Sequence, residues 1–171
     1  MIQEEKVLKN KINYILTGIF LILLDQLIKF FVIKNLYEKS ITIIPNILKF
    51  TYVENTGGAF GLGKNGLAII ILINTIILGL IVYFTIRNKE KMPKSILSVI
   101  LLIGVGGLGN LIDRIFRGFV IDFIDVNPII KFPMFNFADI YVVVGCVLLM
   151  IMMIISDSKK GKVKSHIEGK S

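Results

Sequence analysis

Three aspartates at the ends of apolar segments are the residues of this chain whose types and spacing could do chemistry. Asp113 closes a long apolar run, Asp122 follows nine residues later within Val-Ile-Asp-Phe-Ile, and Asp139 opens the last apolar run. A carboxyl group in such surroundings needs a partner or a raised pKa. Two neighbouring carboxyl groups that share a proton can activate water, because the ionised member accepts a proton from it. The three aspartates therefore form a candidate hydrolytic site if they meet.

Most other hydrolytic sites are excluded by the residue types of the two longer loops, around residues 34–66 and 113–137. Those loops contain one serine, Ser40, and neither cysteine nor histidine, since Cys146 lies in an apolar run and His166 in the polar tail. Serine–histidine and cysteine–histidine arrangements are thus impossible there. Zinc would lack its nitrogen and sulfur ligands. A carboxylate pair without metal or cofactor is left, and the residue types alone do not say which two aspartates form it.

The elements that must position these residues are membrane helices. The 171 residues are 54% hydrophobic with a mean hydropathy of +0.78, which is too apolar for a soluble domain of this size. Crossing a bilayer takes about 20 helical residues. Four runs are long enough: Tyr14–Ile33, Leu67–Ile86, Ser95–Ile112 and Ala138–Ile155. We predict an all-α membrane protein, a four-transmembrane-helix bundle in one membrane-embedded domain over residues 1–171.

Basic residues indicate the orientation of the bundle. They gather at residues 6–11, in the short loop at 87–94 and in a tail from about 157 to 171. Because basic residues favour the cytoplasmic side, we expect both termini inside and the loops around 34–66 and 113–137 outside. The net charge of +8 is then a topology signal, and we expect no nucleic-acid partner.

The first outer loop is expected to hold a small β-rich region at about 40–63. Residues 40–53 are rich in β-branched and aromatic side chains, and glycines follow at Thr56-Gly57-Gly58 and Gly61-Leu62-Gly63. Such a segment predicts short strands and turns. It is too apolar for a linker, so we expect it to pack on the bundle or contact lipid.

Several polar residues have simple structural explanations. Asp25 and Lys29 are spaced for an ion pair within the first span, and Lys29 can also extend toward the interface. Asp113 can pair with Arg114 at a polar helix end. On position alone, these structural explanations are favoured over direct chemistry.

Two further patterns concern helix ends and helix packing. Asn136 or Asp139 can cap the last helix. The run Gly104-Val-Gly106-Gly107-Leu-Gly109 formally matches a dinucleotide motif, but that motif needs a preceding strand. Within a membrane span, small residues allow helices to approach closely, which is the interpretation we favour.

Five blocks of the sequence resemble the conserved blocks of lipoprotein signal peptidases, also called signal peptidase II. They are Asp25 with Lys29, Asn55-Thr-Gly57-Gly-Ala59-Phe60-Gly61, Gly109-Asn110-Leu-Ile-Asp113-Arg114, Val120-Ile-Asp122-Phe123 and Phe135-Asn136-Phe-Ala138-Asp139. One block alone would be weak, whereas five in the right order over most of the chain are specific.

The resemblance implies an aspartic endopeptidase whose catalytic residues are Asp122 and Asp139. The residues that it implies as supports of the site or holders of the substrate main chain are Asn55, Gly57, Asn110, Arg114 and Asn136, and the structural ones are Asp25, Lys29 and Asp113. The implied substrate is a prolipoprotein whose lipobox cysteine already carries diacylglycerol, cleaved just before that cysteine.

The resemblance also implies a place in the bacterial cytoplasmic membrane, with the site at the outer face and in contact with lipid. We expect a monomer. The glycine-containing first outer loop is expected to close over the bound peptide.

Two other classes of function stay open. Intramembrane Asp, Lys and Asn also mark ion paths, so a small ion or proton transporter is the main alternative. A non-enzymatic scaffold is the other. The acids gather at the outer face and no charge lies near the inner half of a span, which argues against transport. A scaffold would need neither Asp122 nor Asp139.

Overall fold

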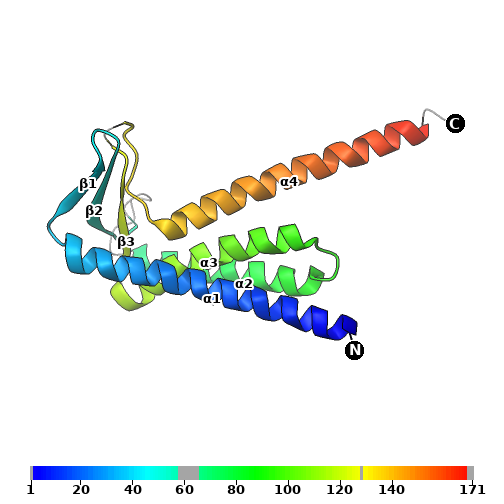
Figure 1. The fold of residues 1–171 in the computed structure, drawn as a ribbon, viewed down its shortest axis with the longest axis horizontal. Coiled ribbons are helices and arrows are strands. Elements are labelled where there is room, and N and C mark those ends of the chain that lie inside the picture. The colour runs from blue at the N-terminus through cyan, green and yellow to red at the C-terminus, as the bar shows by residue number, and fades with distance from the viewer. Residues whose placement is uncertain (1, 58–65, 128, 169–171) are drawn as a thin grey trace.

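Four long helices and a small sheet make up the part of the chain that the structure describes, a computed structural model of residues 2–57, 66–127 and 129–168 (Figure 1). In chain order the elements are α1 (Ile2–Leu36), β1 (Ser40–Ile44), β2 (Leu48–Asn55), α2 (Leu67–Asn88), α3 (Lys94–Arg117), β3 (Val120–Asp125) and α4 (Phe137–Glu168). The stretches long and apolar enough to cross a membrane are Ile12–Leu36, Leu67–Asn88, Lys94–Arg117 and Phe137–Ser156. The four predicted spans are confirmed.

Two helices continue beyond the expected spans. α1 begins at Ile2, well before Tyr14, and α4 continues to Glu168 through most of the segment expected to be a tail. The reason is that hydropathy locates the membrane-crossing part of a helix, not its end. Both extensions lack proline and are rich in lysine, which is a good helix former.

The glycines of α3 allow it to lie close to its neighbours. A Cβ added at Gly106 would overlap the backbone carbonyl oxygen of Ala138 on α4. A Cβ added at Gly109 would lie 2.8 Å from Oδ2 of Asp25 on α1. α3 contacts α1, α2 and α4. The interpretation as packing residues is therefore confirmed for Gly106, Gly107 and Gly109, whereas a Cβ added at Gly104 would meet nothing within 4 Å.

The three strands form an antiparallel sheet in the order β1-β2-β3 at the end of the bundle opposite the start of α1 and the end of α4 (Figure 1). The predicted strands of the first outer loop are confirmed. β3 comes from the loop between α3 and α4 and was not predicted. Its six residues are all buried, so its sequence lacks the polar alternation of a half-exposed strand, and its partner β2 lies far away in the chain.

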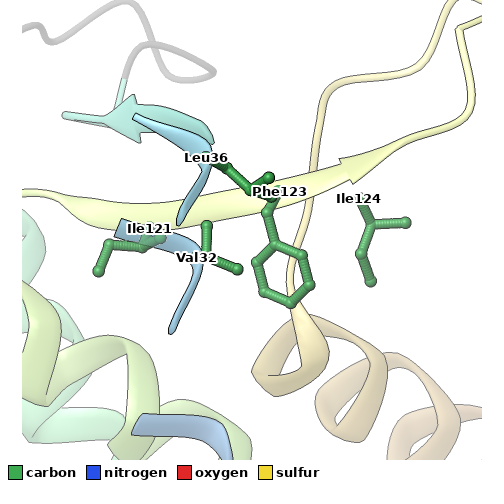
Figure 2. Packing of buried hydrophobic residues seen from close by; sticks show 5 residues of the cluster. All are labelled: Val32, Leu36, Ile121, Phe123 and Ile124. Atoms are coloured by element: carbon green, nitrogen blue, oxygen red, sulfur yellow. The ribbon is translucent and has the colours of Figure 1, made fainter. Parts of the chain in front are cut away.

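An apolar cluster fixes β3 against the C-terminal end of α1 (Figure 2). Val32 and Leu36 are one helical turn apart and pack with Ile121, Phe123 and Ile124. Full burial of each such side chain stabilises the fold by about 1.5–3 kcal/mol. Neighbouring residues of a strand point to opposite faces. Ile121 and Phe123 point toward the apolar cluster, so the Asp122 side chain between them points away from it.

Candidate active site

Asp122 lies on β3 and is held by the end of β2. In the sheet Val53 is opposite Asp122 and Asn55 is opposite Val120, so Asn55 and Asp122 are diagonal neighbours on one face. Asn55 Nδ2 donates a hydrogen bond to Asp122 Oδ2 at 2.8 Å. Asn55 Oδ1 accepts the Gly57 N–H at 2.9 Å, and Gly57 has a φ of 90° that favours glycine. Gly57 thus orients Asn55, and Asn55 orients Asp122.

The surroundings of Asp122 change its acidity. Burial, with a smaller contribution from the negative charge of Asp139, raises the pKa of Asp122 from its ordinary value of 3.8 to about 6. Hydrogen bonds from Asn55 and Asn136 and the charge of Lys29 lower the pKa, because they favour the ionised form. A carboxyl group that keeps its proton at higher pH can donate a hydrogen bond to a substrate carbonyl.

Asp139 lies in the first turn of α4 and is tied to Asn136. Asn136 Oδ1 accepts the Asp139 N–H at 3.0 Å, and Asp139 Oδ2 accepts the Asn136 N–H at 3.0 Å. These reciprocal bonds cap the helix, so the predicted capping role is confirmed for both residues. Asp139 Oδ1 also accepts a hydrogen bond from Asn110 Nδ2 at 2.7 Å.

Asn136 contacts both carboxyl groups. Its Nδ2 donates to Asp122 Oδ1 at 2.7 Å, and its backbone N–H donates to Asp139 Oδ2. The same Nδ2 lies 3.1 Å from Asn110 Oδ1 and 3.2 Å from the backbone oxygen of Ile121. Asn136 is fully buried. The two aspartates are therefore joined inside the protein by the hydrogen bonds that each accepts from Asn136.

Asp113 is engaged by two cations. Its carboxylate lies 2.8 Å from Lys29 Nζ and pairs with Arg117. The expected pairing with Arg114 is wrong, because residues four apart share a helix face and adjacent residues do not. The Asp25–Lys29 pair is confirmed at 2.9 Å. The expected outward extension of Lys29 is wrong, since the residue is 0% exposed.

Gln26 and Arg117 complete this ionic network and were not identified from the sequence. Gln26 Nε2 donates to Asp113 Oδ1 and to the Gly109 carbonyl oxygen, both at 3.2 Å. Gln26 Oε1 accepts from Arg117 Nη1 at 2.9 Å. The four-residue spacing from Asp113 could have identified Arg117. Nothing in the sequence singles out Gln26, whose role depends on the packing of α1 against α3.

Arg114 lies beside the two aspartates of the candidate site. Its charge interacts most strongly with Asp139 and then with Asp122. Nη1 donates to the Asn110 carbonyl oxygen at 3.3 Å, while Nε is buried without an acceptor among the described residues. Over residues 2–57, 66–127 and 129–168, no group of three or more His, Cys, Asp or Glu side chains could hold a metal ion.

Comparison with known proteins gives consistent matches over most of the chain. The family model described as signal peptidase (SPase) II matches residues 17–155. A lipoprotein signal peptidase of Clostridioides difficile (strain 630) is 44% identical over 147 residues, which cover 85% of this chain and 97% of the relative. One from Streptococcus thermophilus (strain CNRZ 1066) is 35% identical over 134 residues, or 78% and 86% of the two chains. A solved structure of a bacterial membrane enzyme has a TM-score of 0.75 and 34% identity, covering 82% of this chain and 92% of that one.

Proposed function

The chain belongs to the signal peptidase II family, and we propose that it removes signal peptides from prolipoproteins with Asp122 and Asp139 as its catalytic pair. The observation that carries this assignment is the contact of Asn136 with both carboxyl groups, at 2.7 Å and 3.0 Å. Each of the four carboxyl oxygens accepts one hydrogen bond from an amide group. A carboxylate oxygen has a second lone pair, with which it can bind water or substrate.

The charges around the site favour one shared proton. The charged groups are four carboxyl groups and three cations, namely Asp25, Asp113, Asp122, Asp139, Lys29, Arg114 and Arg117. One proton on the carboxyl groups makes this set neutral, and a low-dielectric environment favours neutrality. We assign the proton to Asp122, because burial raises its pKa to about 6, whereas Asp25 and Asp113 are paired with Lys29.

Peptide cleavage then follows from general acid–base catalysis. Asp139 takes a proton from water as the water oxygen attacks the scissile carbonyl carbon, and Asp122 gives its proton to the carbonyl oxygen. In the second step, Asp139 gives the proton to the leaving nitrogen, the carbon–nitrogen bond breaks, and one hydroxyl of the intermediate returns a proton to Asp122. Both aspartates end in their starting protonation states.

The polar residues around the pair have two roles in this proposal. Asn55, Asn110 and Asn136 hold the carboxyl groups through the hydrogen bonds described above. Arg114 holds the substrate main chain, because its Nε–H lacks an acceptor in the described part of the chain and peptide carbonyl oxygens accept such bonds.

We further propose that the site lies at the outer face of the bacterial cytoplasmic membrane, with both termini in the cytoplasm and the chain acting as a monomer. Support comes from the sheet and the site lying at one end of the bundle, whereas the start of α1 and the end of α4 lie at the other (Figure 1). Most of the glycine-containing segment expected to close over the peptide, residues 58–65, lies outside the described residues.

A direct test uses the purified chain and a prolipoprotein whose lipobox cysteine carries diacylglycerol. We expect the prolipoprotein to be cleaved at one bond. Mass spectrometry of the product should then show the lipid-modified cysteine as its new N-terminal residue. The unmodified prolipoprotein in the same detergent is the control, and we expect little cleavage of it. Equal cleavage of the two forms would contradict recognition of the lipid, and cleavage elsewhere would contradict the assigned bond.

A further inference from the structure

Lys29 lies where the ionic network meets the catalytic pair. Its Nζ is 2.9 Å from Asp25 Oδ2, 2.8 Å from Asp113 Oδ2 and 3.1 Å from Asn110 Oδ1. An ammonium group has three hydrogens and no lone pair, so these three contacts use all of its donors. Two of them go to buried carboxylates, which fix the direction of the third toward Asn110.

The contact with Lys29 sets the orientation of the Asn110 amide. Because Lys29 can only donate, Asn110 must present its oxygen to Lys29 and its NH2 group to the other side. There, Nδ2 donates to Asp139 Oδ1 at 2.7 Å. The reversed amide would place an oxygen against the Asp139 carboxyl group, and that contact is favourable only when Asp139 is protonated.

Asn136 cannot set this orientation equally well. Its Nδ2 also lies near Asn110 Oδ1, at 3.1 Å, but its two hydrogens are shared among three acceptors. The nearest acceptor is Asp122 Oδ1 at 2.7 Å. The charged donor that holds the Asn110 oxygen is therefore Lys29.

We propose that Lys29 is a positioning residue for catalysis, acting through Asn110 to keep an N–H on Asp139 and so to hold the Asp139 carboxylate in place as the base. This inference rests on the proposed function. Lys29 is 0% exposed and has no access to substrate. The charged groups that face Asp139 from the neighbouring elements are Arg114 on α3 and Asp122 on β3. These charges act in either orientation of the Asn110 amide, so the orientation alone decides whether an N–H or an oxygen faces Asp139.

Two variants separate positioning from charge balance. Lys29→Met removes both the charge and the contact with Asn110. Lys29→Met combined with Asp25→Asn removes one positive and one negative charge. The net charge of the site is then that of the wild type, but the contact between residue 29 and Asn110 is still missing. We expect the double variant to recover melting temperature, while kcat stays about 10- to 150-fold below wild type, the effect of one hydrogen bond to a charged group. KM should stay within about threefold, because the substrate contacts are unchanged.

Full recovery of kcat in the double variant would show that Lys29 acts through charge alone and would overturn the proposal. Asp125→Asn on β3 is the matched control, because Asp125 is a buried aspartate outside the charged set around the site and its carboxylate accepts hydrogen bonds from Asn127. Its kcat should stay within about threefold of wild type.

A third variant tests the role of the Asn110 N–H even if the Lys29 variants do not fold. Asn110→Asp keeps an acceptor for Lys29 but has no N–H for Asp139, so we expect the same fall in kcat as in the double variant. Asp139→Asn is measured in parallel. Turnover by Asp139→Asn would contradict the catalytic pair itself. An inactive Asp139→Asn beside a fully active Asn110→Asp would contradict only the positioning role.

Discussion

Replacement of Asn136 by serine or alanine separates its two roles, capping of α4 and alignment of the two aspartates. The side-chain oxygen of Asn136 caps the helix by accepting the Asp139 N–H at 3.0 Å, and its Nδ2 holds Asp122 at 2.7 Å. Asn136→Ser keeps an oxygen that can cap the helix and loses the amide donor. Asn136→Ala loses both. The difference in stability between the two variants therefore reports on the helix cap. The loss of activity that they share reports on the alignment of the aspartates.

The expected magnitudes follow from the contacts of this one side chain. Loss of a helix cap costs about 1 kcal/mol, so Asn136→Ala should be less stable than Asn136→Ser by about that amount. A hydrogen bond to a charged group contributes about 1.5–3 kcal/mol, which is about 10- to 150-fold in rate. Both variants should lose this factor in kcat/KM, because neither has an N–H for Asp122.

The assay is cleavage of lipid-modified prolipoprotein beside thermal unfolding in the same detergent. We expect the two variants to have similar activity and different melting temperatures. An Asn136→Ser variant within about twofold of wild-type kcat/KM would refute the alignment role. Equal melting temperatures of the two variants would refute the capping role.

Three other substitutions test separate parts of the structure. Asp122→Asn should raise the melting temperature at about pH 8 but little at about pH 4, because ionisation of the buried carboxyl destabilises the wild type as pH rises from the ordinary pKa of 3.8 to about 6. Asp113→Asn should lower stability by about 3–5 kcal/mol, because it breaks buried ion pairs, whereas Asp125→Asn on β3 should be nearly neutral in a parallel unfolding measurement. Gly106→Ala should lower yield, stability and activity, because its Cβ overlaps the backbone of α4, while Gly104→Ala, with nothing within 4 Å, should stabilise α3 by up to about 1 kcal/mol.

The spans and the first two strands could be predicted because their signals are local. Length and hydropathy are enough to locate the four spans, and β-branched residues are enough for β1 and β2. β3 could not be found in this way, since Val120–Asp125 is a short buried run whose partner is more than sixty residues earlier in the chain.

The same distinction applies to the polar residues. The Asp25–Lys29 pair and the cap at Asn136 follow from spacing along one helix. The contacts of Lys29 with Asp113 and Asn110 depend on how α1 packs against α3, which no spacing within either helix specifies. The assignment of Asp122 and Asp139 as the catalytic pair came from the family resemblance and stays a prediction.

The most direct test of the catalytic pair is the cleavage rate of lipid-modified prolipoprotein by Asp122→Asn and Asp139→Asn. Asn has the shape of Asp but can neither accept the proton from water nor supply the shared proton. Asp125→Asn is the matched control, because Asp125 is a buried aspartate of the same strand whose carboxylate accepts hydrogen bonds from Asn127. We expect no detectable turnover by the first two variants, wild-type turnover by the control and folded protein in all three. Clear residual turnover by either Asp122→Asn or Asp139→Asn would contradict the assignment of this pair.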